Sequence, residues 1–213
     1  MSEVLHDRLE GLIDDLVRLT LLAETAMGRA TTALVEADAQ LAARAVADTA
    51  AVAALCDAID EHALDLAARD HVESADLRAL VAALRMTVDL GRMGVLARHV
   101  AQIAARQAPH HTVPGDLRKT VERMARIAEE TTATTRRAVS SRDWHVAADV
   151  ARSSIEMQSL AKDLYEQLVS DPRPHAFETA MDVTLLGRYY ERYTDHAVAV
   201  ARRVPVLAGS TGP

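Results

Sequence analysis

Two carboxylates in the last part of the sequence, Glu191 and Asp195, lie four residues apart in a segment with helical spacing. Side chains four residues apart on a helix project from the same face, so these like charges repel unless something positive lies between them. Carboxylate oxygens suit hard cations such as magnesium, manganese and calcium, and they also bind iron. The pair is therefore a candidate metal site, for which neighbouring helices would have to supply the remaining ligands.

A second acidic pair, Asp57 and Glu61, has the same spacing and is a weaker metal candidate. Its counterparts 105 positions further along the chain are Lys162 and Glu166. The lysine ammonium would compete with a bound cation, which weakens the case for metal. The only cofactor that the sequence indicates is a divalent or iron cation at these acidic positions.

The alternative to a metal or partner site at the first pair is a structural role. Glu191 lies three residues from Arg188, and Asp195 lies three residues from Arg192. Ion pairs at this spacing stabilise an exposed helix by only roughly a few tenths of a kcal/mol each. The residues alone leave both interpretations open.

No other residues form a recognisable catalytic or cofactor motif. Cys56 is the only cysteine, which excludes an intramolecular disulfide and a zinc site built on several cysteines. Its helical spacing from Val52 and Ile59 predicts a small core residue. The sequence contains no Gly-rich phosphate loop, no Ser/His/Asp arrangement and no dedicated anion pocket that can be recognised. We therefore assign no catalytic residue.

We interpret the glycines and tyrosines near the acidic pair and its counterpart first as packing residues. Gly91 and Gly94 fall within a predicted helix, where each costs about 1 kcal/mol relative to Ala. This cost favours close approach of a neighbouring helix over ligand binding. Tyr189, Tyr190 and Tyr193 are predicted to lie in the core, with a patch facing a partner as the alternative.

The elements that must position these residues are helices. Apolar residues recur at three- and four-residue steps, aromatic residues make up only 3% of the 213 residues, and no strand pattern competes. We expect helices over residues 3–37, from 38 to beyond 66, 74 to beyond 103, 116–140, 143–170 and 173–203. The Gly- and Pro-rich residues 205–213 are expected to form a frayed tail.

The second three helices read as a repeat of the first three. A shift of 105 positions aligns Asp38 with Asp143, whereas a shift of 100 aligns Gly91 with Glu191, so the first half has about five extra residues near 70–74. The predicted fold is all-α, with six long helices in two antiparallel three-helix bundles related by a pseudo-twofold axis. We expect a first repeat over 1–108, a linker over 109–115, a second repeat over 116–204 and a flexible tail over 205–213.

Charge and composition narrow the classes of function. A net charge of -7 and a pI near 5.7 argue against nucleic-acid binding, which needs clustered Lys and Arg. A hydrophobic content of 49% is enough to build a core. No run of about 18 apolar residues is present, and the first residues lack a basic segment followed by an apolar one. We expect a cytoplasmic protein.

The doubled three-helix plan, together with the run Gly187-Arg188-Tyr189-Tyr190-Glu191-Arg192-Tyr193-Thr194-Asp195-His196-Ala197, resembles the PhoU family of phosphate-transport accessory proteins. Residues 89–101 resemble a degraded copy of this run, in which Gly91 and Val95 replace the acids. Asp38 and Asp143 fit the helix-to-helix turns of the family. The resemblance covers nearly the whole chain.

The resemblance implies a regulator that is not an enzyme. It implies partners, namely the ATPase subunit of a phosphate ABC transporter and a sensor histidine kinase, between which the protein is an adaptor. Such a protein represses phosphate uptake and the phosphate-starvation response, and it contacts the membrane only through its partners. The family also implies a homodimer, and metal clusters at paired acidic motifs in some members. A metal-storing or metal-sensing helical bundle is the alternative function.

Overall fold

The structure, a computed structural model, describes residues 3–68, 73–170 and 175–208, and the side chains from residue 9 onward within these ranges. The expected extra residues near 70–74 fall partly outside this description. So do the first residues of the sixth expected helix, which begins at 173, and residues 209–213 of the expected tail.

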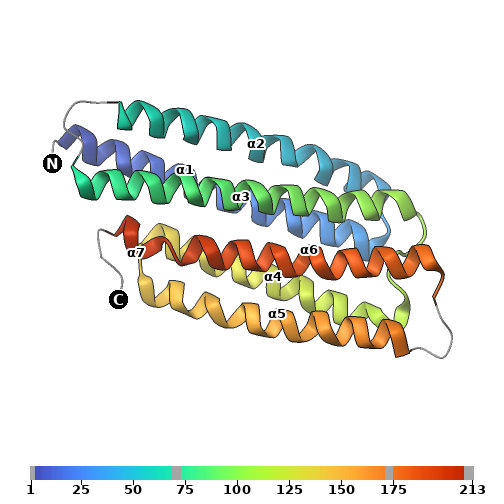
Figure 1. Ribbon diagram of the computed structural model, residues 1–213. Coiled ribbons are helices and arrows are strands. Elements are labelled where there is room, and N and C mark those ends of the chain that lie inside the picture. The colour runs from blue at the N-terminus through green and yellow to red at the C-terminus, as the bar shows by residue number, and fades with distance from the viewer. Residues whose placement is uncertain (1–2, 69–72, 171–174, 209–213) are drawn as a thin grey trace.

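Six long helices make up most of the described chain (Figure 1). They are α1 (Glu3–Glu36), α2 (Ala39–Ala67), α3 (Ser74–Gln107), α4 (Gly115–Ser141), α5 (Trp144–Ser170) and α6 (Phe177–Ala201). Successive helices run in opposite directions, and no strand occurs in the described ranges. None of these helices combines the length and the apolar character needed to cross a lipid bilayer.

The helices form two bundles that pack side by side. Helices α1, α2 and α3 contact one another, and so do α4, α5 and α6. The bundles meet along two seams, where α1 packs on α4 and α3 packs on α6, while α2 and α5 lie on the outside (Figure 1). This confirms the predicted all-α fold of two antiparallel three-helix bundles related by a pseudo-twofold axis.

The turns before α2 and α5 repeat the same local structure. Ala37 and Arg142 each have a left-handed φ of 54°, which ends the preceding helix. Asp38 then caps α2, since its carboxylate accepts bonds from the backbone N–H of Gln40 and Leu41. The Asp143 carboxylate likewise accepts a bond from the backbone N–H of His145, at 2.8 Å. The repeat therefore extends to the turn chemistry.

The core between the bundles is closed by two tyrosines of α6. Tyr190 and Tyr193 are fully buried, which confirms their predicted core position. The Tyr193 hydroxyl donates to the carbonyl oxygen of Ala23 at 3.0 Å, and the Tyr190 hydroxyl bonds the Thr31 hydroxyl at 2.8 Å. Both bonds join α6 to α1. Since a buried hydroxyl without a partner is costly, these bonds let the rings fill the interface.

Glycines on α3 allow α2 to approach closely. A Cβ atom at Gly94 would lie 2.7 Å from Cγ1 of Val52, and one at Gly91 would lie 3.2 Å from Sγ of Cys56. Real Cβ atoms essentially never come as close as the first of these distances, so a side chain at position 94 would force Val52 or its helix to shift. The predicted packing role of both glycines is confirmed.

The expected frayed tail is wrong at its start. Residues Val204–Leu207 form a short helix, α7, that packs mainly against α3. Val204 and Leu207 are three residues apart, so they lie on one face, and both are buried. Pro205 lies in the first turn, where its missing N–H removes no helical bond. The composition alone did not reveal this apolar face.

Candidate functional site

The acidic pair of α6 faces α5, but its two carboxylates have separate partners. Glu191 pairs with Arg188, whose Nη1 lies 2.6 Å from the Glu191 Oε2, and the Glu191 side chain is 17% exposed. Asp195 accepts a hydrogen bond of 2.9 Å from the Ser154 hydroxyl of α5. The ion pair expected between Arg192 and Asp195 is not formed among the described residues. Helix α5 thus offers a hydroxyl to Asp195, not a carboxylate or an imidazole.

The surroundings of Glu191 are cationic as well as acidic. A pocket of about 520 Å³ between α5 and α6 is lined by Glu191 and Arg188, and by Lys162 and Tyr165 of α5. Lys162 also lies 3.6 Å from the Glu166 carboxylate. Burial is the main cause that raises the pKa of the Tyr165 hydroxyl, and the charge of Glu191 adds to it. Two ammonium or guanidinium groups in one pocket would compete with a metal cation.

The second acidic pair is remote from the first. Asp57 and Glu61 are exposed on α2, which packs mainly on α1 and α3. In the described part of the chain, no three His, Cys, Asp or Glu side chains gather in a way that could hold a metal ion. The metal sites at Glu191 and Asp195, and at Asp57 and Glu61, therefore stay predictions from the sequence. A metal-storing role is not favoured.

The surface between α3 and α6 holds a groove that the sequence did not reveal. Its volume is about 380 Å³. The polar lining is basic and comes from both bundles, namely Arg92, His99, Arg188, Arg192 and His196. Val95, Leu96, Leu185 and Tyr189 form its apolar part. No carboxylate is among the described residues that line it.

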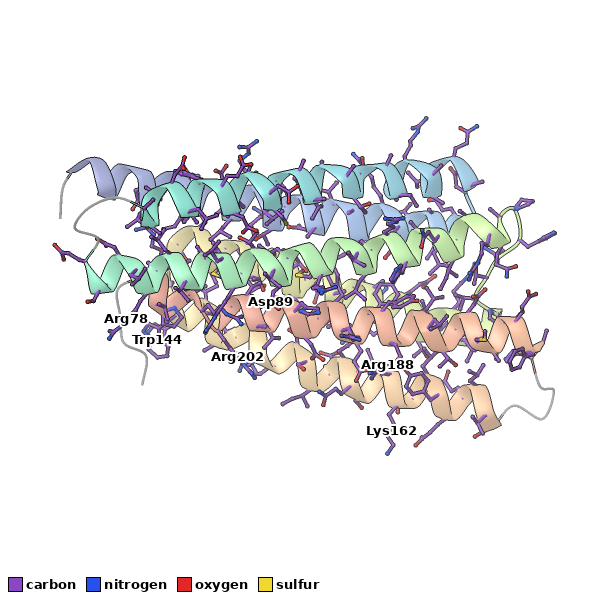
Figure 2. The ribbon with its side chains drawn as sticks, turned by 45° about the horizontal axis from the view of Figure 1, so that its top comes forward. Arg78, Asp89, Trp144, Lys162, Arg188 and Arg202 are labelled. Atoms are coloured by element: carbon purple, nitrogen blue, oxygen red, sulfur yellow. The ribbon has the colours of Figure 1, made fainter. Side chains whose placement is uncertain are left out.

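Asp89 of α3 orients one histidine of this groove. Its carboxylate oxygens lie 2.9 Å from the His196 Nδ1 and 2.8 Å from the Arg203 Nη1, and Figure 2 shows Asp89 at the seam between α3 and α6. A carboxylate can only accept, so the His196 Nδ1 carries the proton of this bond. The charge of Asp89 is thereby matched by Arg203.

The second histidine, His99, packs against an aromatic ring of α6. The ring centroids of His99 and Tyr189 are 5.1 Å apart and the planes are inclined by 43°. The His99 Nδ1 is buried and has no hydrogen-bond partner among the described atoms. Three contacts between α3 and α6 follow antiparallel packing, because the residue number rises along α3 as it falls along α6. The contacts are Asp89–His196, His99–Tyr189 and Arg106–Asp182.

Two arginines of the groove occupy matching positions in the repeat. Arg192 is the counterpart of Arg92 at the shift of 100 residues. The antiparallel α3–α6 packing brings both to the same groove, one from each bundle. Neither forms an ion pair within the described ranges, unlike Arg188. The equivalence of Arg92 and Arg192 under the shift of 100 positions was the available sequence signal, but the packing of α3 on α6 was needed to interpret it.

Two three-helix bundles of matching plan, with a basic groove on the seam between them, define the class of the protein as an all-α bundle built from a repeat. The PhoU domain family matches residues 16–104 and 121–204, one match in each bundle. The chain belongs to the PhoU domain family, which confirms the resemblance.

Similar proteins extend over the full chain. This chain is 39% identical to the phosphate-specific transport system accessory protein PhoU homolog 2 of Mycobacterium tuberculosis, over all of both chains. It is 38% identical to the PhoU homolog 1 of Mycobacterium leprae, over all of this chain and 96% of that one. The crystal structure of PhoU from Pseudomonas aeruginosa has a TM-score of 0.85 at 24% identity and covers 95% of this chain and 98% of that one.

A second solved structure has the same fold. The phosphate transport system regulatory protein PhoU from Streptococcus pneumoniae has a TM-score of 0.86 at 17% identity and covers 96% of each chain.

Proposed function

We propose that this chain is a negative regulator of phosphate uptake and of the phosphate-starvation response. It acts by contact in the cytoplasm, as an adaptor between the ATPase subunit of a phosphate ABC transporter and a sensor histidine kinase. The observation that carries the proposal is the full-length match to proteins named as accessory to phosphate-specific transport. No catalytic step is part of it, and the membrane is reached only through the partners.

The exposed face of α3 is suited to contact with a partner. Leu77, Val81 and Val88 are 48%, 40% and 60% exposed, and their four- and seven-residue steps keep them on one face of the helix. Arg78 and Arg85 lie between them and are exposed, and Figure 2 labels Arg78 near the start of α3. An amphipathic acidic helix of a partner matches such a stripe in both charge and hydrophobicity.

A pull-down from phosphate-rich cells tests the adaptor role. We expect the tagged chain to capture both a transporter ATPase subunit and a histidine kinase. Val88→Glu should reduce this capture because it places a like charge against the acidic partner. Ile155→Glu is the matched control, since Ile155 is 72% exposed on α5, away from α3. Capture of neither partner by the unmodified chain would contradict the adaptor role, and equal loss in both variants would contradict the role of α3.

We further propose that the chain is a homodimer, as its family resemblance implies. Sedimentation equilibrium of the purified chain should give twice the monomer mass of 23.1 kDa. A mass that stays at the monomer value across the concentration range would refute dimerisation and leave the adaptor role untouched.

A further inference from the structure

The groove between α3 and α6 concentrates positive charge in an acidic protein. The chain has a net charge of -7, yet three arginines and two histidines line the groove, and no carboxylate is among its described lining residues. The carboxylates of Glu191, Asp89 and Asp195 have partners of their own, since Glu191 pairs with Arg188, Asp89 binds His196 and Arg203, and Asp195 accepts a bond from Ser154. A concave site lined by one sign of charge attracts ions of the opposite sign.

Arg92 and Arg192 are the cations available to a ligand. Both are exposed, and neither has a carboxylate partner in the part of the chain that the structure describes. They come from opposite sides of the groove, because α3 supplies one and α6 the other. Each guanidinium offers five N–H donors in a planar fork, which fits the oxygens of a phosphoryl group in bidentate fashion.

His196 adds a polar atom to the groove, whereas the His99 Nδ1 is buried. The bond from Nδ1 of His196 to Asp89 fixes the imidazole and leaves its Nε2 unused by that bond. The buried Nδ1 of His99 has no partner among the described atoms. An atom with no accessible surface cannot be reached from the groove, so His99 contributes its ring to the groove wall and not a hydrogen bond to the ligand.

The apolar part of the lining indicates more than a bare anion. Val95 is 44% exposed, and Leu185 and the ring of Tyr189 line the same groove. The volume of about 380 Å³ falls within the range of small-molecule sites and exceeds what a single phosphate ion fills.

We propose that this groove binds a small molecule that carries a phosphoryl group. Arg92 and Arg192 hold the phosphoryl oxygens, the His196 Nε2 accepts a hydrogen bond from an O–H or N–H group of the ligand, and any remaining body of the ligand lies on Val95, Leu185 and Tyr189. The phosphoryl group belongs either to free phosphate or to a phosphomonoester such as a nucleotide. This site deepens the proposed function, because it would let the chain itself respond to a phosphorylated ligand.

Calorimetric titration of the purified full chain tests the site. The probes are inorganic phosphate, adenosine monophosphate and adenosine, at one fixed ionic strength. We expect phosphate or adenosine monophosphate to bind, and Arg92→Gln or Arg192→Gln to weaken that binding by about tenfold or more, since each removes charge-assisted hydrogen bonds. Arg126→Gln is the matched control, because Arg126 is an exposed arginine of α4 that does not line the groove. It should leave the affinity unchanged.

The outcomes distinguish free phosphate from a phosphomonoester as the ligand, and they distinguish failure of this site from failure of the proposed regulatory function. Tighter binding of adenosine monophosphate than of phosphate identifies a phosphomonoester, and the reverse order identifies free phosphate. The site is overturned if neither probe binds, if adenosine binds as tightly as its monophosphate, or if Arg92→Gln and Arg192→Gln bind like the Arg126→Gln control. Circular dichroism confirms that each variant is folded. A chain that binds no phosphoryl ligand but still represses starvation genes overturns this site alone.

Discussion

The close contact between α2 and α3 gives the sharpest prediction about stability. Replacing Gly94 with Ala would put its Cβ 2.7 Å from Cγ1 of Val52, which is 2% exposed and cannot move into solvent. Overpacking of this kind costs about 1–3 kcal/mol. The better helix propensity of Ala returns about 1 kcal/mol. The clash outweighs the propensity gain, and we expect Gly94→Ala to lower the free energy of unfolding by about 1 kcal/mol, and by about 2 kcal/mol at most.

Gly28 of α1 is the matched control. A Cβ atom there would lie 3.6 Å from the Glu129 Oε1, an ordinary van der Waals distance. Gly28→Ala should therefore show the helix propensity gain without the clash and stabilise the chain by up to about 1 kcal/mol. The two variants make the same chemical change in a long helix, and their opposite signs depend only on the neighbouring helix.

The partner of Gly94 supplies the second half of the test. Val52→Ala removes the atom that a Cβ at position 94 would meet. The double variant should be more stable than the sum of the two single effects by about 1 kcal/mol or more, because the new methyl group occupies vacated space. Urea-induced unfolding, followed by far-UV circular dichroism, measures the free energy of unfolding of the parent chain, of each single variant and of the double variant. Stabilisation by Gly94→Ala equal to that by Gly28→Ala would refute the packing argument.

Three further predictions concern buried and half-buried groups. Tyr193→Phe, which removes the hydrogen bond to the Ala23 carbonyl, should lower the free energy of unfolding in urea by about 0.5–1.5 kcal/mol; no change would contradict a role for that bond. Burial raises the pKa of Glu129 above its ordinary value of 4.5, and the charges of Glu24 and Glu130 add to this shift. Ionisation of Glu129 therefore lowers the stability of the folded chain as the pH rises from 4.5 through the raised pKa. Glu129→Gln should therefore be more favourable to stability in urea unfolding at about pH 7 than at about pH 4, and the opposite order would contradict the raised pKa. Burial, with the charges of two nearby aspartates, raises the pKa of Cys56 from 9.0 to about 11. At neutral pH the Cys56 thiolate is therefore roughly a hundredfold scarcer than in an unfolded chain. Alkylation of Cys56 by iodoacetamide should be correspondingly slower in the native chain than in the urea-unfolded chain.

Properties of single helices were predictable from the sequence. The apolar period of each helix, the matched turns at Asp38 and Asp143, and the small residues at Gly91 and Gly94 are local signals. Local signals determine which face of a helix is apolar and where the helix ends. They suffice for the fold because antiparallel neighbours joined by short turns have few ways to pack.

Properties that depend on how two distant helices meet were not predictable. The spacing of Arg192 and Asp195 allows an ion pair, but the Ser154 hydroxyl, 41 residues away, binds Asp195 in its place. The groove likewise exists only because α3 and α6 pack antiparallel and bring Arg92 and Arg192 together. The composition of the tail suggested fraying, yet Val204 finds an apolar surface on the assembled bundles. In each case the deciding partner is remote in sequence.

The most direct test of the central claim, that this chain represses the phosphate-starvation response, is a reporter fused to a phosphate-starvation promoter. The reporter is measured in phosphate-rich medium with and without the gene for this chain. We predict high reporter expression in the deletion strain and low expression once the wild-type chain is restored. Low expression in both strains would contradict the account.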